Sequence, residues 1–443
     1  MLSDLAYLVS IPTLSDDRDA NRKALDWVIE RAASFGLRAR TVCDGQVGEI
    51  EIPADPQAQD AGDKAPETAA ILVHLDVVTP GIIENWETDP FTLTRKDGKL
   101  IGRGVQDDKG PLIASLYAMK KLASDDLPLR RTIRMIIGTK EETDWEDIYQ
   151  YTAEYPLPDY GFTPDGEFPI CISEKGILEL DGFVPYRPGQ TDGWHLTDIN
   201  SGNMNNTVPG KATAEMTLFE NGQPKQTRSF TASGKSIHSG EPELGDNAIY
   251  HLIDEIEKIG PAESSAWETL QLLRSKFADP YGRVLGIHNE SEYYEGEYVG
   301  QNTICVTRLE IKDDELWFHV DIRYIMGADP KALQERLQHA VAPLGGRITE
   351  FMDLPPAFVK SDMPFIRILQ EEYQKQTGVE AVCKSSSGGT YAQAMPGIVT
   401  FGPSFPDERD TCHEENEFVT EASFMRCCAI YTEAIKRLAT SEF

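Results

Sequence analysis

Histidine and carboxylate side chains stand at the ends of several apolar segments in this 443-residue chain. Imidazole nitrogens and carboxylate oxygens together suit zinc or manganese better than copper or an iron–sulfur cluster. Five such ligands are enough for two metal ions that share one bridging carboxylate. The candidate metal ligands selected on this basis are His74, Asp107, Glu142, Asp165 and His413.

The first candidate ligand, His74, lies in the apolar run AAILVHLDVV (69–78), which is typical of a strand covered on both faces. Asp76 follows two residues later, and side chains two apart on a strand point to the same face. The Asp76 carboxylate could therefore orient the imidazole while the other ring nitrogen binds a metal ion. Taken alone, the pattern is also that of a strand-end histidine with no ligand.

Asp107 occurs in the glycine-rich segment LIGRGVQDDKGP (100–111), just before a predicted helix that begins near Gly110. Glycines allow the backbone to approach a site closely, and a carboxylate in such a turn can bridge two cations. The alternative is that Asp107 and Asp108 only cap the N-terminus of the helix.

Two adjacent glutamates, Glu141 and Glu142, follow the predicted strand RTIRMIIGT (131–139). At the end of a strand they could divide the work, because one can bind metal while its neighbour transfers protons. The alternative is a solvated acidic turn. Asp165 and His413 stand in segments that are ordinary by themselves, and the HEENE segment that begins at His413 lacks the second histidine of an H-E-x-x-H zinc helix.

The elements that must position these residues follow from the pattern of apolar segments. Strand, helix and strand alternate with short links in the first part of the chain, which indicates an α/β layer with a mainly parallel sheet. Alternating segments such as ELWFHVDIRY (315–324), with helical patterns between them, are typical of an α+β arrangement with antiparallel strands. We therefore expect one α/β domain formed by residues 1–184 and 358–443, interrupted by an inserted α+β domain at 185–357.

Charge and cysteine content argue against several classes of protein. Lys and Arg number 42 and Asp and Glu 73, which gives a formal net charge of −31. A polyanion repels phosphate backbones and anionic membranes, so we expect no nucleic-acid partner and no membrane partner. The seven cysteines form no C-x-x-C pair, and the chain starts without the pattern of a signal peptide, so we expect a cytoplasmic protein with reduced thiols.

Taken in order, the motifs of the chain resemble those of the dinuclear metallopeptidase family that includes carboxypeptidase G, aminoacylase and carnosinase. Within that family, the chain is similar to bacterial dipeptidases of the PepV type. The resemblance implies a zinc-exopeptidase-like catalytic domain, with the inserted domain as its lid. The motifs that carry it extend from residue 69 to residue 418 and are HLDVV, GRGVQDDKGP, EET-W, FTPDGEFP, HSG-P--G-NA, GGTY and HEENEF.

The resemblance implies that two divalent metal ions are bound, with zinc as the first choice and manganese as the second. Asp107 would bridge the two ions. His74 and Asp165 would complete one site, and Glu142 and His413 would complete the other.

The resemblance also implies roles for residues beside the metal ligands. Asp76 would orient the His74 imidazole, and Glu141 would be the general base. The peptide bond between Asp107 and Asp108 would be cis.

Substrate contacts are implied for several lid positions. His238 would donate a hydrogen bond to the oxyanion, and Asn206 and Arg323 match lid residues that contact substrate. Two alternatives stay open, since Arg323 could form only a surface ion pair and the glycines of the GGTY motif only a turn. The loop that would hold the terminal carboxylate of the substrate consists of Gly388, Gly389 and Thr390.

The activity that the resemblance implies is that of a metal-dependent dipeptidase, in which two metal ions and Glu141 activate a water molecule that hydrolyses the peptide bond of a dipeptide. An N-acyl-amino-acid deacylase would use the same dinuclear site and remains the alternative. The insert at 185–357 is larger than the lid of dimeric relatives, so a monomer is expected.

Overall fold

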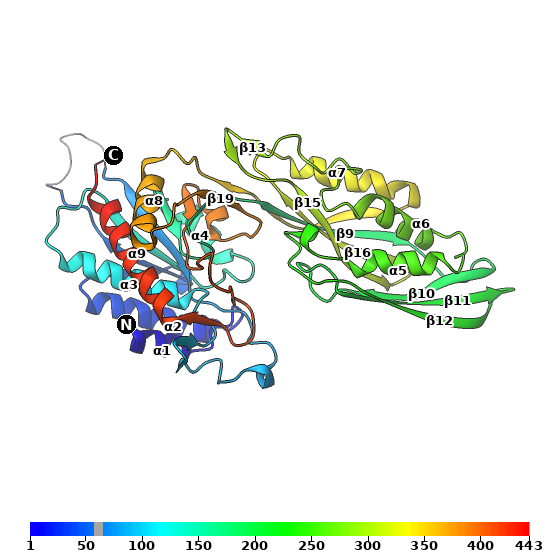
Figure 1. Ribbon diagram of the computed structural model, residues 1–443, viewed down its shortest axis with the longest axis horizontal. Helices are drawn as coiled ribbons and strands as arrows, with labels where there is room; N and C mark the ends of the chain where they lie inside the picture. The colour runs from blue at the N-terminus through cyan, green and yellow to red at the C-terminus, as the bar shows by residue number, and fades with distance from the viewer. Residues whose placement is uncertain (57–64, 443) are drawn as a thin grey trace. The chain divides into compact units, whose positions relative to one another are not determined.

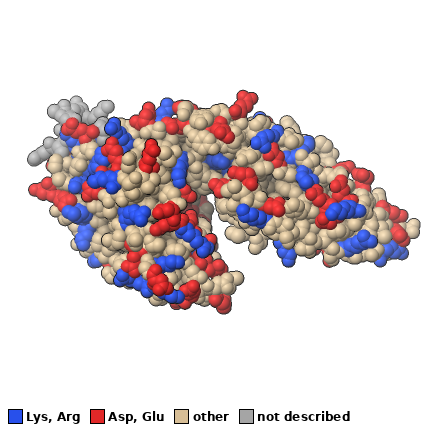
Figure 2. Space-filling view, viewed as in Figure 1, with Lys and Arg blue, Asp and Glu red and all other residues tan. Residues whose placement is uncertain are grey.

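The computed structural model describes residues 1–56 and 65–442, and the chain divides into two compact units (Figure 1). Unit 1 consists of Met1–Ser173, Ala357–Lys384 and Thr390–Phe443, and unit 2 of Glu174–Pro356 and Ser385–Gly389. Each unit has its own apolar core. Figure 2 shows acidic and basic side chains intermixed over the visible face of each unit. The expected fold class, an α/β domain with an inserted α+β domain, is confirmed.

Unit 2 begins earlier in the chain than the sequence-based boundary at residue 184. Strand β9 (Gly176–Pro185) pairs with β16 (Glu315–Tyr324) and β17 (Arg347–Leu354), and all three strands belong to unit 2. Because both partners of β9 come much later in the chain, its local sequence pattern does not reveal them. The segment Ser385–Gly389 also groups with unit 2, although the sequence placed it in the other domain.

The central sheet of unit 1 has parallel strands in the middle and antiparallel strands at its flanks. In strand order it consists of β1 (Arg38–Val42), β2 (Val47–Ile52), β6 (Thr132–Gly138), β3 (Thr68–His74), β7 (Tyr160–Thr163), β20 (Ile398–Thr400), β8 (Ile170–Glu174) and β18 (Ala357–Phe358), with β19 (Cys383–Ser386) paired to β8. β3 is parallel to β6 and β7, and β20 is parallel to β7, whereas β1–β2, β2–β6 and β8–β20 are antiparallel. The expected mainly parallel sheet is therefore mixed.

Helices and short turns complete unit 1. Helix α9 packs against both α3 and α8, and α3 also contacts β3. Pro111 stands in the first turn of α3, where its missing N–H costs no helical hydrogen bond, and Leu112 and Leu116 are buried against the core. These elements are α1 (Leu2–Val9), α2 (Arg18–Ser34), α3 (Lys109–Ser124), α4 (Glu146–Glu154), α8 (Pro364–Thr377), α9 (Glu421–Thr440), η1 (Cys43–Gly45), η2 (Ile83–Asn85), η6 (Tyr391–Ala394) and a small sheet of β4 (Thr94–Lys96), β5 (Lys99–Ile101) and β21 (Phe418–Thr420).

The parallel strands explain why ligands from distant parts of the sequence meet. His74 is the last residue of β3 and lies opposite Gly138, the last residue of β6. The carboxyl ends of parallel strands lie at the same edge of a sheet, which is where open α/β folds place their sites. His74 therefore lies at the same edge of the sheet as the segments that follow β6 and β7, which carry Glu141, Glu142 and Asp165.

Unit 2 is an antiparallel sheet with helices on one face. Along β16, Leu316, Phe318, Val320 and Ile322 belong to the apolar core that also contains residues of all three α-helices. The alternate side chains of the same strand therefore lie on the other face, which the helices do not cover. The elements are β12 (Gln223–Ser233), β11 (Lys211–Glu220), β10 (Gly193–Ser201), β15 (Thr303–Lys312), β16, β9 and β17 in strand order, the hairpin β13 (Tyr293–Tyr294) and β14 (Glu297–Tyr298), helices α5 (Ala248–Glu257), α6 (Ser265–Leu272) and α7 (Pro330–Val341), the 3-10 helices η3 (Pro242–Leu244) and η5 (Ala342–Leu344), and the π-helix η4 (Leu273–Phe277).

His319 lies on the face of this sheet that the helices do not cover, between two carboxylates. Its Nδ1 is 2.8 Å from Asp181 Oδ1 and its Nε2 is 3.1 Å from Glu179 Oε2. Burial disfavours the charged ring, but the hydrogen bonds to Asp181 and Glu179 outweigh that effect and raise the pKa of His319 to about 9. The imidazolium therefore stabilises the fold fully below pH 6.5, and this contribution is lost as the pH rises through about 9.

Replacing His319 should make the melting temperature of the protein change less between pH 7 and pH 10. A pKa raised from 6.5 to about 9 corresponds to about 3 kcal/mol. His319→Gln should therefore lower the melting temperature of the metal-loaded protein at pH 7, and the difference from wild type should shrink by pH 10. The control is His251→Gln, which changes an exposed histidine of α5. An equal loss of melting temperature at both pH values would contradict the assignment.

Candidate metal centre

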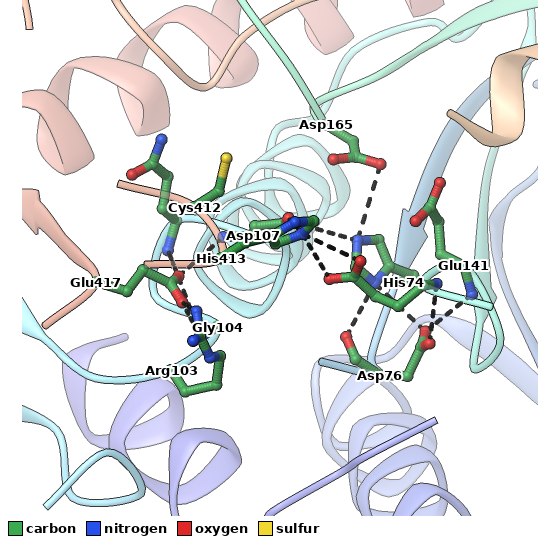
Figure 3. A network of polar contacts seen from close by, with 12 residues as sticks. His74, Asp76, Arg103, Gly104, Asp107, Glu141, Asp165, Cys412, His413 and Glu417 are labelled. Atoms are coloured by element: carbon green, nitrogen blue, oxygen red, sulfur yellow. Dashed lines mark hydrogen bonds and ion pairs between the residues drawn. The ribbon is translucent and has the colours of Figure 1, made fainter. Parts of the chain in front are cut away.

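Asp107 stands between two histidines at the edge of the unit 1 sheet (Figure 3). Its Oδ1 is 2.9 Å from His74 Nε2, and its Oδ2 is 3.0 Å from His413 Nε2. Each carboxylate oxygen thus faces a different imidazole. This is the arrangement that a carboxylate needs in order to bridge two cations. The peptide bond between Asp107 and Asp108 is cis, as the family resemblance implies.

The His74 side of the site contains a second carboxylate. Asp165, in the segment after β7, places its Oδ2 3.8 Å from His74 Nε2. The carboxylate of Glu141 lies nearby, since ligand atoms of His74, Glu141 and Asp165 all lie within 4.8 Å of one another. Figure 3 shows Asp165 and Glu141 on the same side of Asp107 as His74.

The His413 side of the site contains Glu142. Its carboxylate oxygens lie 3.1 and 3.2 Å from His413 Nε2, so Glu142 and Asp107 face the same ring nitrogen. Glu142 also forms a group with His74 and Asp107 in which all ligand atoms lie within 4.8 Å. The five candidate metal ligands, which we call the metal centre, therefore come together in unit 1.

The His74 ring is oriented by the backbone more than by the carboxylate that the sequence suggested. His74 Nδ1 is 3.0 Å from the carbonyl oxygen of Asp76 and 3.4 Å from its Oδ1. When Nδ1–H donates to this carbonyl, the lone pair of Nε2 points toward Asp107 and Asp165. The His74 side chain is only 1% exposed, so this orientation is also held by packing.

The Asp76 carboxylate also holds the turn that carries both glutamates. Its Oδ1 accepts the Glu141 N–H and its Oδ2 accepts the Glu142 N–H, each at 3.1 Å, and Ser15 Oγ donates to Oδ2 at 2.7 Å. Burial by itself raises the pKa of Asp76, but the contacts with His74, Ser15 and Glu142 lower it overall, so the group is a carboxylate. Asp76 therefore fixes Glu141 and Glu142 relative to His74. Ser15 was missed from the sequence, because a single serine in a polar turn gives no signal.

A buried ion pair fixes the loop that ends in Asp107. Glu417 accepts hydrogen bonds from Arg103 Nη1 at 2.8 Å, from the Gly104 N–H at 3.0 Å and from the Gln106 N–H at 2.8 Å. Both charged side chains are at most 2% exposed. Glu417 lies four residues after His413, so one carboxylate ties together the two loops that carry Asp107 and His413. The sequence contains this pair in the GRG and HEENEF motifs, but spacing alone did not connect them.

The electrostatics of the metal centre fit divalent cations. Burial, followed by the neighbouring Asp165, raises the pKa of Glu141 well above its ordinary value, and burial followed by Asp107 raises that of Glu142. Burial alone would lower the pKa of His413, but its hydrogen bonds to Asp107 and Glu142 raise it to about 12. The clustered side chains of the metal centre therefore retain protons. These protons carry positive charge that bound divalent cations would supply in their place.

The residues expected to contact substrate meet within unit 2, where we call Asn206, His238, Arg323, Gly388 and Gly389 the lid cluster. The Ser239 N–H donates to the Asn206 carbonyl at 2.9 Å, and Thr207 and His238 form an antiparallel bridge. Arg323 Nη1 donates to the carbonyl of Ser387 at 3.2 Å, which brings the strand end of β16 to the glycine loop. Arg323 is 3% exposed, so it is not the surface ion pair that the sequence left open.

Two contacts define the chemistry of the lid cluster. The Gly240 N–H donates to His238 Nδ1 at 3.1 Å, so the proton of the neutral ring is on Nε2, where it can be donated. The Gly388 N–H donates to Ser386 Oγ at 3.1 Å, so this amide already has an acceptor within the loop.

Thr390 differs from the other residues expected to contact substrate. It belongs to unit 1, and its Oγ1 accepts the Ala392 N–H at 3.1 Å as the N-cap of η6.

Comparison with known proteins gives matches over almost the whole chain. Residues 70–437 match the model of Peptidase family M20/M25/M40. The Bacillus subtilis (strain 168) protein named "Putative dipeptidase YtjP" is 33% identical, over 94% of this chain and 90% of its own length. None of the helices in the described part of the chain has the length and apolar character that crossing a membrane requires.

Solved structures of low sequence identity share the fold. Aminoacylhistidine dipeptidase from Vibrio alginolyticus has a TM-score of 0.64 at 14% identity and covers 100% of this chain and 96% of its own. Human carnosine dipeptidase 1 has a TM-score of 0.61 at 16% identity and covers 99% of this chain and 95% of its own.

Proposed function

The chain belongs to peptidase family M20/M25/M40, as its motifs predicted, and from this premise we propose that it is a dipeptidase with a dinuclear metal site. The observation that carries the proposal is the position of Asp107, whose two oxygens face the imidazoles of His74 and His413 separately. The dipeptidase name of the Bacillus subtilis relative supports the substrate class. The narrower PepV-type assignment stays a prediction.

We assign the metal ligands as the sequence suggested. His74 and Asp165 would hold one ion, Glu142 and His413 the other, and Asp107 both. When bound, divalent ions lower the pKa of a water molecule and polarise a carbonyl group. Zinc is our first choice and manganese our second, because both accept imidazole and carboxylate ligands.

Glu141 is the proposed general base. Its carboxylate takes a proton from the attacking water and returns it to the leaving amine nitrogen. The position of Glu141 supports this role, since its carboxylate lies within 4.8 Å of ligand atoms of His74 and Asp165 beside the metal centre. Asp76 holds the backbone of Glu141 in place through the amide contact at 3.1 Å.

His238 and Arg323 are the proposed substrate contacts of the lid cluster. His238 would donate its Nε2–H to the developing oxyanion, a contact worth roughly 3 kcal/mol in comparable sites. The loop of Gly388, Gly389 and Thr390 would hold the terminal carboxylate of the dipeptide. Arg323, whose Nη1 donates to the neighbouring Ser387 carbonyl, would bind the same carboxylate, and Asn206 would be a further substrate contact. The tautomer set by Gly240 supports the first role, and the burial of Arg323 supports the second.

Removing and replacing the metal tests the proposal. Treatment with EDTA should abolish dipeptide hydrolysis, and addition of Zn²⁺ or Mn²⁺ should restore it, with two ions per chain by elemental analysis. EDTA that is already saturated with zinc serves as the control. Full turnover by metal-free protein would refute the mechanism.

A choice of substrates separates the proposed activity from its alternative. A dipeptide with a free amine and an N-acetyl amino acid should be compared by kcat/KM in the restored enzyme. Preference for the dipeptide supports the dipeptidase, whereas preference for the acetylated compound would identify an N-acyl-amino-acid deacylase.

Two further proposals concern the protein in the cell. We propose a cytoplasmic location, supported by the finding that, within the described residues, no disulfide joins the seven cysteines. A monomeric state remains our expectation from the size of the inserted domain.

A further inference from the structure

One carboxylate in unit 2 has no role in the proposed reaction, although it contacts both Arg323 and the loop that carries His238. Asp321 lies on β16 two residues before Arg323, on the sheet face that the helices do not cover. Its side chain is completely buried, and that of Arg323 is 4% exposed. A buried charge is costly unless it is paired and hydrogen-bonded, so the contacts of Asp321 define what it does.

Asp321 holds the guanidinium of Arg323 along one edge. Arg323 Nε donates to Asp321 Oδ1 at 2.9 Å, and Arg323 Nη2 donates to Oδ2 at 3.0 Å. This two-point contact fixes the plane of the guanidinium as well as its position. Side chains two apart on one strand point to the same face, which is why this pair can form without any distortion of β16.

The remaining donors of Arg323 are therefore aimed in a fixed direction. A guanidinium has five N–H donors, and Asp321 and the Ser387 carbonyl accept three of them among the described residues. The two that remain, one on each terminal nitrogen, match the number that a bidentate carboxylate contact uses. Asp321 thus leaves Arg323 with the donors that recognise a carboxylate.

Ser239 connects the same carboxylate to the loop that carries His238. Its hydroxyl donates to Asp321 Oδ2, and its backbone N–H donates to the Asn206 carbonyl at 2.9 Å. Ser239 is 1% exposed. A Cβ atom added at Gly240 would lie 3.1 Å from the Ser387 side chain, so the His238 loop also packs closely against the glycine loop.

We infer that Asp321 and Ser239 are positioning residues, which set the direction of Arg323 and couple it to the loop of His238. The inference rests on the proposed function. It makes the recognition of a free terminal carboxylate dependent on Asp321, a residue that touches neither the carboxylate nor the reacting atoms.

The test compares a dipeptide with the C-terminal amide of the same dipeptide, using the metal-loaded full chain. Wild type should prefer the free carboxylate. Asp321→Asn should lower kcat/KM for the dipeptide about 10- to 100-fold, the range expected for loss of a charged hydrogen bond, and mainly through KM. Its effect on the amide should be much smaller, so the ratio of the two kcat/KM values should collapse. Ser239→Ala should lower the same ratio by a smaller factor.

Matched variants separate positioning from a general loss of structure. Asp198→Asn, an exposed aspartate on β10, and Ser236→Ala, an exposed serine before the His238 loop, should leave the ratio unchanged. In an Arg323→Ala background, Asp321→Asn should have no further effect on the ratio. Melting temperature and metal content identify variants that fail to fold. If Asp321→Asn fails to fold, the ratio measured for Ser239→Ala tests the inference by itself.

The outcomes are distinguishable from a failure of the proposed function. If wild type hydrolyses dipeptides but Asp321→Asn and Ser239→Ala lower the rates for acid and amide equally, the two residues are merely structural and this inference is wrong. An unchanged ratio in both variants also overturns it. If wild type hydrolyses no dipeptide with any metal, the proposed function fails and the inference fails with it.

Discussion

Glu141→Gln should bind two metal ions as wild type does and lose about 10³-fold in kcat, within the range known for removal of a general base. The amide has the size of the carboxylate but cannot accept a proton from water. The turn that positions it should persist, because the Glu141 N–H bonds to Asp76 through the backbone, which the substitution does not change. The measurement is kcat at saturating dipeptide, together with metal content per chain.

Two further glutamate variants make this result specific. Glu146→Gln changes an exposed glutamate at the start of α4 and should keep wild-type turnover. Glu142→Gln should lose metal as well as activity, since the Glu142 carboxylate lies 3.1 Å from His413 Nε2 within the metal centre. A wild-type rate in Glu141→Gln would eliminate Glu141 as the base. Loss of metal from Glu141→Gln would instead indicate that Glu141 is a metal ligand.

The metal centre could be predicted from the sequence because its residues follow apolar strands. Three of the five ligands stand on β3 or in the segments that follow β6 and β7. Because parallel strands have their carboxyl ends at the same edge of a sheet, these ligands can be expected to lie close together. His413 does not follow a strand in this way, so its residue type and the resemblance to a family were what connected it to the others. Its place is fixed by Glu417, which contacts the Asp107 loop across 310 residues of sequence.

The residues that position the site could not be predicted in the same way. Ser15 and Arg103 act through side-chain hydrogen bonds to the carboxylates of Asp76 and Glu417, and such contacts leave no periodic pattern. The role of Asp76 is a related case. Its spacing from His74 predicted a carboxylate–imidazole contact, and Asp76 Oδ1 does lie 3.4 Å from His74 Nδ1. The spacing did not predict that the same carboxylate also accepts the N–H groups of the glutamate turn.

Long-range strand pairing also limited what the sequence could say about unit 2. The alternation in ELWFHVDIRY identified β16 and its two faces, but not that the second face carries a network of buried charges. Arg323 therefore stayed open between a surface ion pair and a substrate contact. Its burial depends on Asp321 and on the Ser385–Gly389 segment, which comes from a distant part of the sequence.

Asp107→Asn should remove both metal ions, whereas changes at the other ligands should remove one each. Asp107 Oδ1 faces His74 at 2.9 Å and Oδ2 faces His413 at 3.0 Å, and an asparagine offers only one uncharged oxygen in place of the two. We expect less than one ion per Asp107→Asn chain after gel filtration and a loss of roughly 10³-fold or more in kcat, as several kcal/mol of Lewis-acid stabilisation would disappear.

The single-site variants decide whether Asp107 is a bridge or an ordinary ligand. Asp165→Asn and His413→Ala should each retain about one ion per chain, because each removes a ligand from one side of Asp107 only. Asp126→Asn, an exposed aspartate after α3, should retain two ions and full activity. If Asp107→Asn retains one tightly bound ion, as the single-site variants do, the carboxylate serves one metal. The two ions would then be held independently, by ligand sets that meet at this edge of the sheet without sharing a group.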